Sequence, residues 1–320
     1  MTWLDLLRAI GVLAVLFGAA AMMIWVERRL LALLQDRAGP NRRGPLGLLQ
    51  PVADVVKLLF KEDWTPPFAD RLLFVFAPNI VVITVLAAFA TVPFAPGLAV
   101  AELDVGLLFV LGMLSLGIYS VTLGGWSSNN KYALVGSLRA AAQMISYELP
   151  LGLALVGVVL LTGSFKLSDI VLAQAGYRWF VFLQPVGFVL FLVAGLAEVR
   201  RVPFDLPEAE SELVAGYHAE YSSMKFALFF LGEYLDVLLI SSLVVILYLG
   251  GWEGPWLPPV LWFALKTGVL AAGFVVVRGS LPRFRFDQLM ALGWKVLIPL
   301  SLLNLLVTAA VLLLIGAPAP

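Results

Sequence analysis

The chain has 320 residues, of which 61% are hydrophobic and only 13% are charged, and its formal net charge is zero. Because an ordinary soluble domain is about a quarter charged, this composition excludes a soluble globular protein and predicts an integral membrane protein. The neutral balance gives no indication of nucleic-acid binding. Without cysteine and with a single histidine, the chain cannot hold an iron–sulfur cluster, a disulfide or a bis-histidine haem, and a tight metal site is not expected.

Eight apolar stretches are long enough to cross a bilayer as helices, which takes about 20 residues. Pro and Gly cluster between them, as is typical of turns. We therefore predict an all-α integral membrane protein with about eight transmembrane helices, forming one polytopic domain over residues 1–320. The first stretch is too long for the apolar core of a cleaved signal, and its basic cluster follows it. The predicted spans are 6–33, 73–93, 105–125, 138–162, 179–199, 225–250, 258–278 and 294–315.

Lysine and arginine are distributed very unequally between the two sets of loops. Seventeen of them fall in or beside the odd-numbered loops, and only Arg8, Lys166 and Arg178 fall on the other side. By the positive-inside rule, the odd-numbered loops face the cytoplasm and both termini lie outside, in the periplasm.

The last turn of the first span reads Glu27-Arg28-Arg29. Arginines are expected there from the topology, but a glutamate at the membrane edge is less routine. Two interpretations are open: Glu27 pairs with Arg28, or it faces a polar headgroup.

The loop after the first span contains GPNRRGPLGLLQPVADVVKLLFKED, which predicts an amphipathic helix over about 46–61 on the cytoplasmic side. At roughly 14 residues it is too short to span the bilayer. It either anchors the chain at the interface, with its lysines on lipid phosphates, or walls a cavity for an amphipathic ligand. Its polar residues share one helix face: Gln50, Asp54, Lys57 and Lys61.

Residues 197–236 concentrate acidic side chains in this apolar chain. A carboxylate in hydrocarbon costs several kcal/mol unless it is paired, protonated or hydrated, so these acids predict a polar path through the protein. His218, in the same segment, is interpreted as a satisfied polar residue. The eight acids are Glu198, Asp205, Glu208, Glu210, Glu212, Glu220, Glu233 and Asp236.

Three of these acids are expected near the start of one helix. Pro203 and Pro207 break the chain, and Asp205 or Leu206 is the expected start of a new helix. The helix dipole accounts for part of the acidic run. It can account for Glu208 and Glu210 but not for the whole series. Glu208 and Glu212 share a helix face at positions i and i+4, where like charges repel, and such a pair tends to share a proton or recruit a cation. The nearest counter-charges in the sequence are Arg200 and Arg201.

Four acids lie within predicted spans or at their inner ends: Glu148, Glu198, Glu233 and Asp236. Each is open to two interpretations, a structural ion pair between helices or a site that loads and releases protons. Lys266, inside the seventh span, is the expected cationic partner, unless it is a proton site itself.

Several of these segments resemble one family in order and in sequence. LAEVRRVPFDLPEAESELVAGYHAEYSSMKFALFFLGEY, SLRAAAQMISYELPLG, LPRFRFDQLMALGWKVLIPLSL and the GPNRRGP segment resemble the quinone-site membrane subunit of NADH:quinone oxidoreductase, respiratory complex I. The resemblance runs from about Val26 to Leu302. It implies a non-redox subunit in the bacterial inner membrane that helps to bind the substrate quinone and couples its reduction to proton transport.

The resemblance also implies partners and residue roles. Peripheral-arm subunits would carry the FMN and the Fe–S clusters, and other membrane-arm subunits would pump protons. The quinone chamber would include Glu27, Arg28, Gln50, Asp54 and Lys57, and Arg283 and Arg285 would hold the inner surface and the acidic loop. The acidic path would include Glu148, Glu198, Asp205, Glu208, Glu210, Glu212, Glu220 and Glu233.

Two other classes of membrane protein would need the same kinds of buried acidic and basic residues. One is a self-contained proton or cation transporter, which would be active alone. The other is the equivalent subunit of a membrane-bound hydrogenase-type complex, which need not bind quinone.

Overall fold

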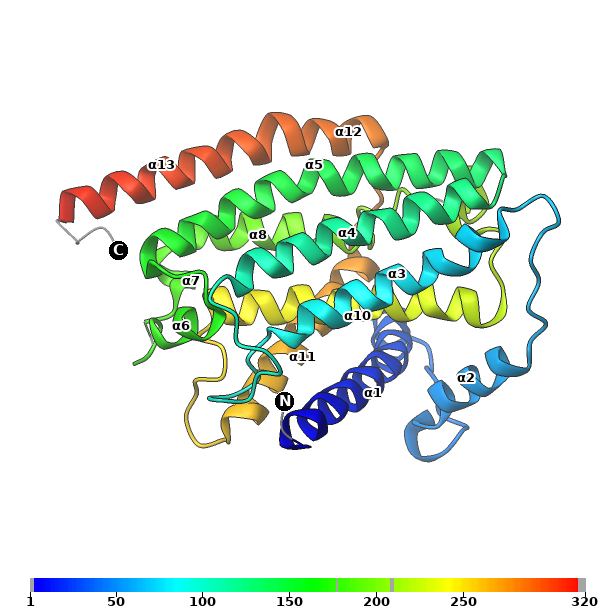
Figure 1. Cartoon of the computed structure of the whole chain (residues 1–320), viewed down its shortest axis with the longest axis horizontal. Helices are drawn as coiled ribbons and strands as arrows, with labels where there is room; N and C mark the ends of the chain where they lie inside the picture. Colours follow the sequence, from blue (N-terminus) through cyan, green and yellow to red (C-terminus); the bar gives the residue numbers. More distant parts are fainter. Residues whose placement is uncertain (1–2, 177, 208–209, 316–320) are drawn as a thin grey trace.

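The computed structural model of the chain describes residues 3–176, 178–207 and 210–315. All the regular elements in these ranges are helices. The bundle is built around α10 (Ser223–Tyr248), which runs through its middle (Figure 1) and is buried almost continuously from Gly232 onward. A helix that is apolar on every side either lies in a protein core or spans a membrane, and α10 is in addition enclosed by neighbouring helices.

Helices pack against α10 from two sides. On one side, α3 (Arg71–Ala90) contacts α10, α4 (Gly106–Ser127) and α5 (Lys131–Thr162) follow in succession, and α8 (Pro185–Glu198) covers α5. On the other side, two helices pack against α10 and against each other (Figure 1). These are α1 (Trp3–Leu34) and α11 (Pro259–Ser280).

Within the described residues, seven helices are long and apolar enough to cross a membrane, which confirms seven of the predicted spans. The eighth, predicted at 179–199, is broken into α7 (Phe180–Leu183) and α8. Gln184 takes a non-helical conformation at the break. Its buried amide donates to the Gly157 carbonyl (3.3 Å) and to the Thr308 hydroxyl (2.8 Å). These hydrogen bonds satisfy polar groups that would be costly in an apolar interior.

The last span is also composite. It starts as α12 (Phe286–Ala291), passes through a π-helical segment (Leu292–Leu297) and continues as α13 (Ile298–Ile315). It packs on α5 at the edge of the bundle, as Figure 1 shows, and most of α13 is exposed. Short elements fill the connections: a 3₁₀ turn at Pro45–Gly47, α6 at Leu167–Leu172, α9 at Glu210–Leu213 and a 3₁₀ turn at Gly216–His218.

The predicted amphipathic helix is α2 (Gln50–Phe60), four residues shorter at its start than the predicted 46–61. Pro45 begins a separate 3₁₀ turn instead, because Leu46 has a φ of 53° and cannot continue a helix. Trp25 of α1 donates its indole N–H to the Leu46 carbonyl (3.0 Å). At the other end of α2, the Ser223 hydroxyl donates to the Leu58 carbonyl (3.0 Å). The apolar residues of α2 remain largely exposed.

Candidate functional site

Charged side chains from distant segments meet at the end of the bundle that carries α2 and residues 199–207 and 212–222. We call this the basic end. Arg139 of α5 pairs with Glu212 (2.7 Å), Asn130 donates to Glu220 (2.7 Å), and Lys225 pairs with Asp63 (3.1 Å). These contacts bring the first, third and fifth loops together.

Glu27 lies in a buried cluster formed by three helices and the turn after α8. Arg201 contacts Glu233 of α10 (Nε–Oε1, 2.7 Å) and Glu27 of α1 (Nη1–Oε2, 3.5 Å). Arg278 of α11 donates to the other oxygen of Glu27. The Arg201 guanidinium also lies 4.7 Å from the centre of the Tyr234 ring, a favourable cation–π position. We call the four charged residues (Glu27, Arg201, Glu233 and Arg278) the Arg201 cluster.

The Arg201 cluster corrects one expectation about the first span. Glu27 is buried, and its ion-pair partners are Arg278 and Arg201 instead of Arg28. Sequence reasoning treats Arg278 only as a topological charge, since it is 251 positions away from Glu27 in the chain. The only local feature of the sequence that points to an ion pair is the position of Arg278 in the last turn of an apolar helix.

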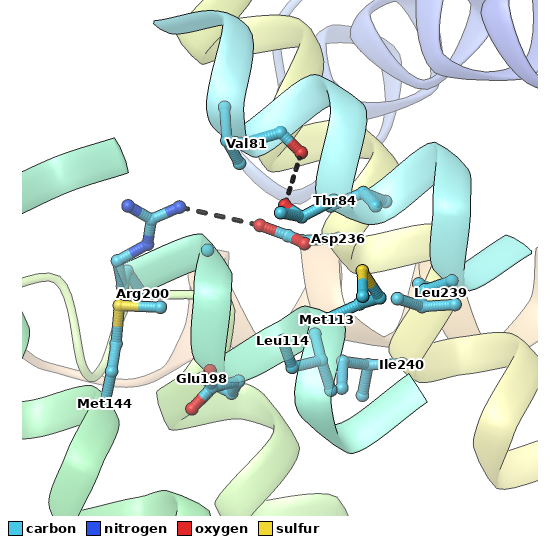
Figure 2. Close-up of a pocket in the computed structure, with 13 residues that line it drawn as sticks. Val81, Thr84, Met113, Leu114, Met144, Glu198, Arg200, Asp236, Leu239 and Ile240 are labelled. Carbon is cyan, nitrogen blue, oxygen red and sulfur yellow. Dashed lines mark hydrogen bonds and ion pairs between the residues drawn. The ribbon is translucent and has the colours of Figure 1, made fainter. Parts of the chain in front are cut away.

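A second buried group lies around a small cavity between α3, α4, α5, α8 and α10 (Figure 2). Arg200 contacts Asp236 (Nη2–Oδ2, 3.5 Å), and Glu198 lines the same cavity. The space for a water centre is about 10 Å³, which is room for about one water. Glu198 Oε2 is buried and has no hydrogen-bond partner in the described part of the chain.

The backbone at Arg200 explains how two consecutive arginines reach different acids. Arg200 has a φ of 61°, in the left-handed region, and ends the helical path of α8 there. Glu233 and Asp236 are three positions apart on α10, so they lie on neighbouring parts of one helix face. Gln143 of α5 holds this turn in place, because its amide donates to the Ala197 (2.7 Å) and Phe204 (2.8 Å) carbonyls.

Lys266 is not the partner of the acids in α10, contrary to the expectation from sequence. Its ammonium donates to the carbonyls of Leu249 (2.6 Å), Gly251 (3.1 Å) and Glu253 (2.6 Å). These carbonyls lie at and beyond the C-terminal end of α10, where a cation satisfies orphan acceptors and complements the helix dipole. The position of Lys266 is therefore explained by the end of α10.

Glu148 of α5 accepts a hydrogen bond from the Ser115 hydroxyl of α4 and is half-buried. Met144, one helical turn earlier, lines the cavity that also holds Glu198. Glu148 is thus near the Glu198 cavity. Pro150, two residues after Glu148, does not interrupt α5, which is continuous to Thr162.

The loop acids have separate partners at the basic end. Arg283 donates to Asp205 (2.8 Å). Burial raises the pKa of the Asp205 carboxyl, and the Arg283 charge opposes that rise. His218 is half-buried, and this burial together with the Arg200 charge lowers its pKa to about 4. His218 is therefore neutral at physiological pH.

The predicted helix start at Asp205 or Leu206 is wrong, because both residues are outside any helix and α9 begins at Glu210. Glu208 and the side chain of Glu210 lie outside the described residues, so the proposed Glu208–Glu212 pair is left as a prediction. Arg285 pairs with Asp287 two residues away (3.1 Å), and both are largely exposed. Within the described ranges Arg285 does not hold the acidic loop, whereas Arg283 does.

The polar face of α2 lies beside the end of α1. Asp54 accepts from Arg28 (2.7 Å) and from Gln50 (3.0 Å), and both Arg28 and Asp54 keep appreciable solvent exposure. Lys57 is exposed one turn further along. Arg28 and Glu27 are adjacent in sequence, so one end of α1 carries both the exposed Asp54 contact and the buried Arg201 cluster.

The comparison with known proteins covers almost the whole chain. A family model described as NADH dehydrogenase matches residues 7–309. The chain belongs to this family. One relative, a subunit of the NADH-quinone oxidoreductase of Geobacter metallireducens, is 54% identical over 94% of each chain.

Other members of the NADH dehydrogenase family are equally similar. The corresponding NADH-quinone oxidoreductase subunit of Methylococcus capsulatus is 56% identical, over 94% of this chain and 96% of its own. The corresponding subunit from Rhodopseudomonas palustris is 55% identical over 95% of each chain. The resemblance identified from the sequence blocks is therefore confirmed, and the chain is a multi-pass membrane protein of that family.

Proposed function

We propose that this chain is the non-redox, quinone-site membrane subunit of a proton-pumping NADH:quinone oxidoreductase in the bacterial inner membrane. The names of its relatives support this assignment. The Arg201 cluster carries the proposal, because it joins buried acids of α1 and α10 directly behind the Arg28–Asp54 contact. The excess of basic residues at this end supports a cytoplasmic location for it, with both termini in the periplasm.

In this proposal the quinone chamber is bounded by α2 and the end of α1. Arg28, Gln50, Asp54 and Lys57 supply hydrogen-bonding and charged groups on one polar wall. The apolar residues of α2 accommodate the rest of an amphipathic quinone. Glu27 faces away from this wall and connects it to Arg201.

The acidic path begins at the same place and leads into the membrane domain. Asp205, Glu212 and Glu220 lie in the loop region, and Glu233 and Asp236 follow on α10. Glu198 and Glu148 continue the path beside the water-sized cavity. A change of charge in the chamber acts on Glu27, and the shared Arg201 transmits it to Glu233, because removing charge from one partner changes how strongly Arg201 stabilises the other.

Other proteins of the complex would supply the electrons. The chain has no cysteine, so the Fe–S clusters belong to peripheral-arm subunits in this proposal, and the family resemblance assigns the FMN to the same subunits. The chain's own residues would bind the quinone and hold or transfer protons. Other membrane-arm subunits would complete proton translocation.

Co-purification tests the proposal against the two alternative classes. We expect an affinity tag on this chain to isolate subunits that contain Fe–S clusters and FMN, with NADH-driven quinone reduction in the same fraction. Proton flux through vesicles that contain this chain alone would instead identify a stand-alone transporter. A purified complex with Fe–S clusters and hydrogenase activity but no quinone reduction would identify the hydrogenase-type class.

Replacing Asp54 with asparagine tests the chamber wall. We expect the apparent KM for quinone to rise about tenfold, as for the loss of a charge-assisted hydrogen bond of ~1.5 kcal/mol. NADH oxidation by a hydrophilic artificial acceptor should be unchanged, because that reaction does not need the chamber. Stability should also be nearly unchanged, since exposed ion pairs contribute about 0–1 kcal/mol.

The matched control for Asp54→Asn is Asp287→Asn, which removes another acid from an exposed arginine pair. It should leave the quinone KM unchanged. Equal losses of quinone reduction and artificial-acceptor activity in Asp54→Asn would contradict the chamber assignment.

A further inference from the structure

A large hollow lies between α1, α10 and α11, beside the loop that follows α3. Its volume is about 550 Å³, many times that of the cavity beside Glu198. It extends along α1 from Arg8 to Val26, which is about 27 Å of helix at ~1.5 Å per residue. That length approaches the ~30 Å thickness of a bilayer core.

The walls of this hollow, which we call the α1–α11 hollow, are apolar and partly made of small residues. Gly11 and Ala19 on α1 line it, as do Ala264 and Gly268 on α11. Small residues in membrane helices normally allow close helix packing. Here a Cβ added at Gly11 or Gly268 would meet nothing within 4 Å. The small residues therefore keep space open between the helices.

One end of the hollow is basic. Arg8 lines it near the start of α1 and is exposed. Arg8 forms no ion pair with any residue that the structure describes. The remainder of the lining is apolar except for Ser242 and Thr267. The hollow thus combines a long apolar groove with a single cation at one end.

We propose that the α1–α11 hollow binds an anionic phospholipid, with one acyl chain along the groove and the phosphate at Arg8. The lining is apolar along nearly the whole length of the groove, which suits an acyl chain, because such a chain is thin and adapts to an irregular apolar wall. The phosphate complements Arg8, which an uncharged quinone headgroup would not.

The Arg8 end of this site, where the phosphate would bind, is separate from the proposed quinone chamber, whereas the other end of the hollow, at Val26, lies next to Glu27. Arg8 and Asp54 lie toward opposite ends of α1, because Asp54 contacts Arg28, twenty positions and about 30 Å further along the helix. The lipid in this site would fill the gap that α1 leaves against α11. It would support the helix that carries Glu27 without taking part in quinone chemistry.

Photolabelling of the purified, delipidated complex with a diazirine phosphatidylglycerol tests the proposal. We expect labelled peptides from residues 11–26 and 260–268. Gly268→Leu, which fills the groove, should reduce this labelling at least fivefold, and Gly11→Leu should do the same from the opposite wall. Arg8→Gln should lower labelling by phosphatidylglycerol about fivefold, as for ~1 kcal/mol per basic residue near anionic lipid. Labelling by phosphatidylcholine should be unchanged in Arg8→Gln.

Gly273→Leu is the matched control, because Gly273 lies on α11, also has open space at its Cβ and does not line the hollow. It should label like the wild type. Equal labelling of Gly268→Leu and Gly273→Leu would overturn the proposal. So would a crosslink from a photoreactive group attached through Ala264→Cys to another protein of the complex, which would identify a protein as the occupant. Because labelling is read without enzyme activity, neither result depends on the proposed quinone function.

Discussion

Replacing Arg201 with methionine is expected to destabilise the protein by about 3–5 kcal/mol, the usual cost of removing one partner from a buried ion pair. Arg201 contacts both Glu27 and Glu233, and all three side chains are at most 10% exposed. Methionine approximates the length of the side chain but leaves two carboxylates close together without this guanidinium. We expect the complex to lose this subunit on native gels, or to melt at a clearly lower temperature.

A second substitution separates the two causes of the lost stability, the uncompensated charge and the changed packing. Arg201→Met combined with Glu233→Gln removes the uncompensated charge on α10, so it should recover part of the lost stability. The two effects should be non-additive because the side chains are in direct contact. Arg285→Met is the matched control, since Arg285 is 78% exposed in its pair with Asp287 and should cost at most about 1 kcal/mol. If Arg201→Met were no more destabilising than Arg285→Met, the Arg201 cluster would not hold the helices together.

Replacing Glu198 with glutamine is expected to reduce quinone-coupled turnover and proton pumping together by at least tenfold while the complex still assembles. Glutamine has nearly the same shape, so the packing around the cavity is preserved. It cannot bind and release a proton, which a carboxylic acid beside Asp236 and a water-sized space can do. The measurement is NADH-driven quinone reduction and acidification in the same vesicles.

Glu102→Gln is the matched control for the Glu198 experiment. Glu102 undergoes the same chemical change but lies in an exposed pair with Lys166, away from the cavity. It should leave both activities unchanged. Normal pumping in Glu198→Gln would remove Glu198 from the acidic path.

The sequence predicted the helices well because length and apolar content are local properties. Seven spans and the amphipathic α2 correspond to predicted segments. The break between α7 and α8 could not be predicted from the sequence, because Gln184 is held there by Gly157 and Thr308, which are distant in sequence. No periodicity within 179–199 indicates those partners.

The pairing of charges was predicted less well, for a physical reason. Hydropathy indicates which residues are buried, but ion pairs depend on which helices are neighbours and on the direction in which each turn leads. Lys266 and Asp236 are both in spans, yet Lys266 reaches the carbonyl of Leu249 and Asp236 meets Arg200. The left-handed backbone conformation of Arg200 directs the Arg200 side chain away from that of Arg201. Nothing in the sequence valine–arginine–arginine predicts this conformation.

The attachment of α2 has a mechanical consequence. The start of α10 holds the end of α2 through the Ser223 hydroxyl, and Lys225 holds the following segment of the chain through Asp63 and Thr65 (2.6 Å). Each such polar contact contributes only about 0.5–1.5 kcal/mol, whereas α10 is buried along most of its length. A force applied to α2 would therefore break these contacts before it displaced α10. The weakest attachment between α2 and α10 is therefore at the end of α2 and in the connector at 61–65 that follows it.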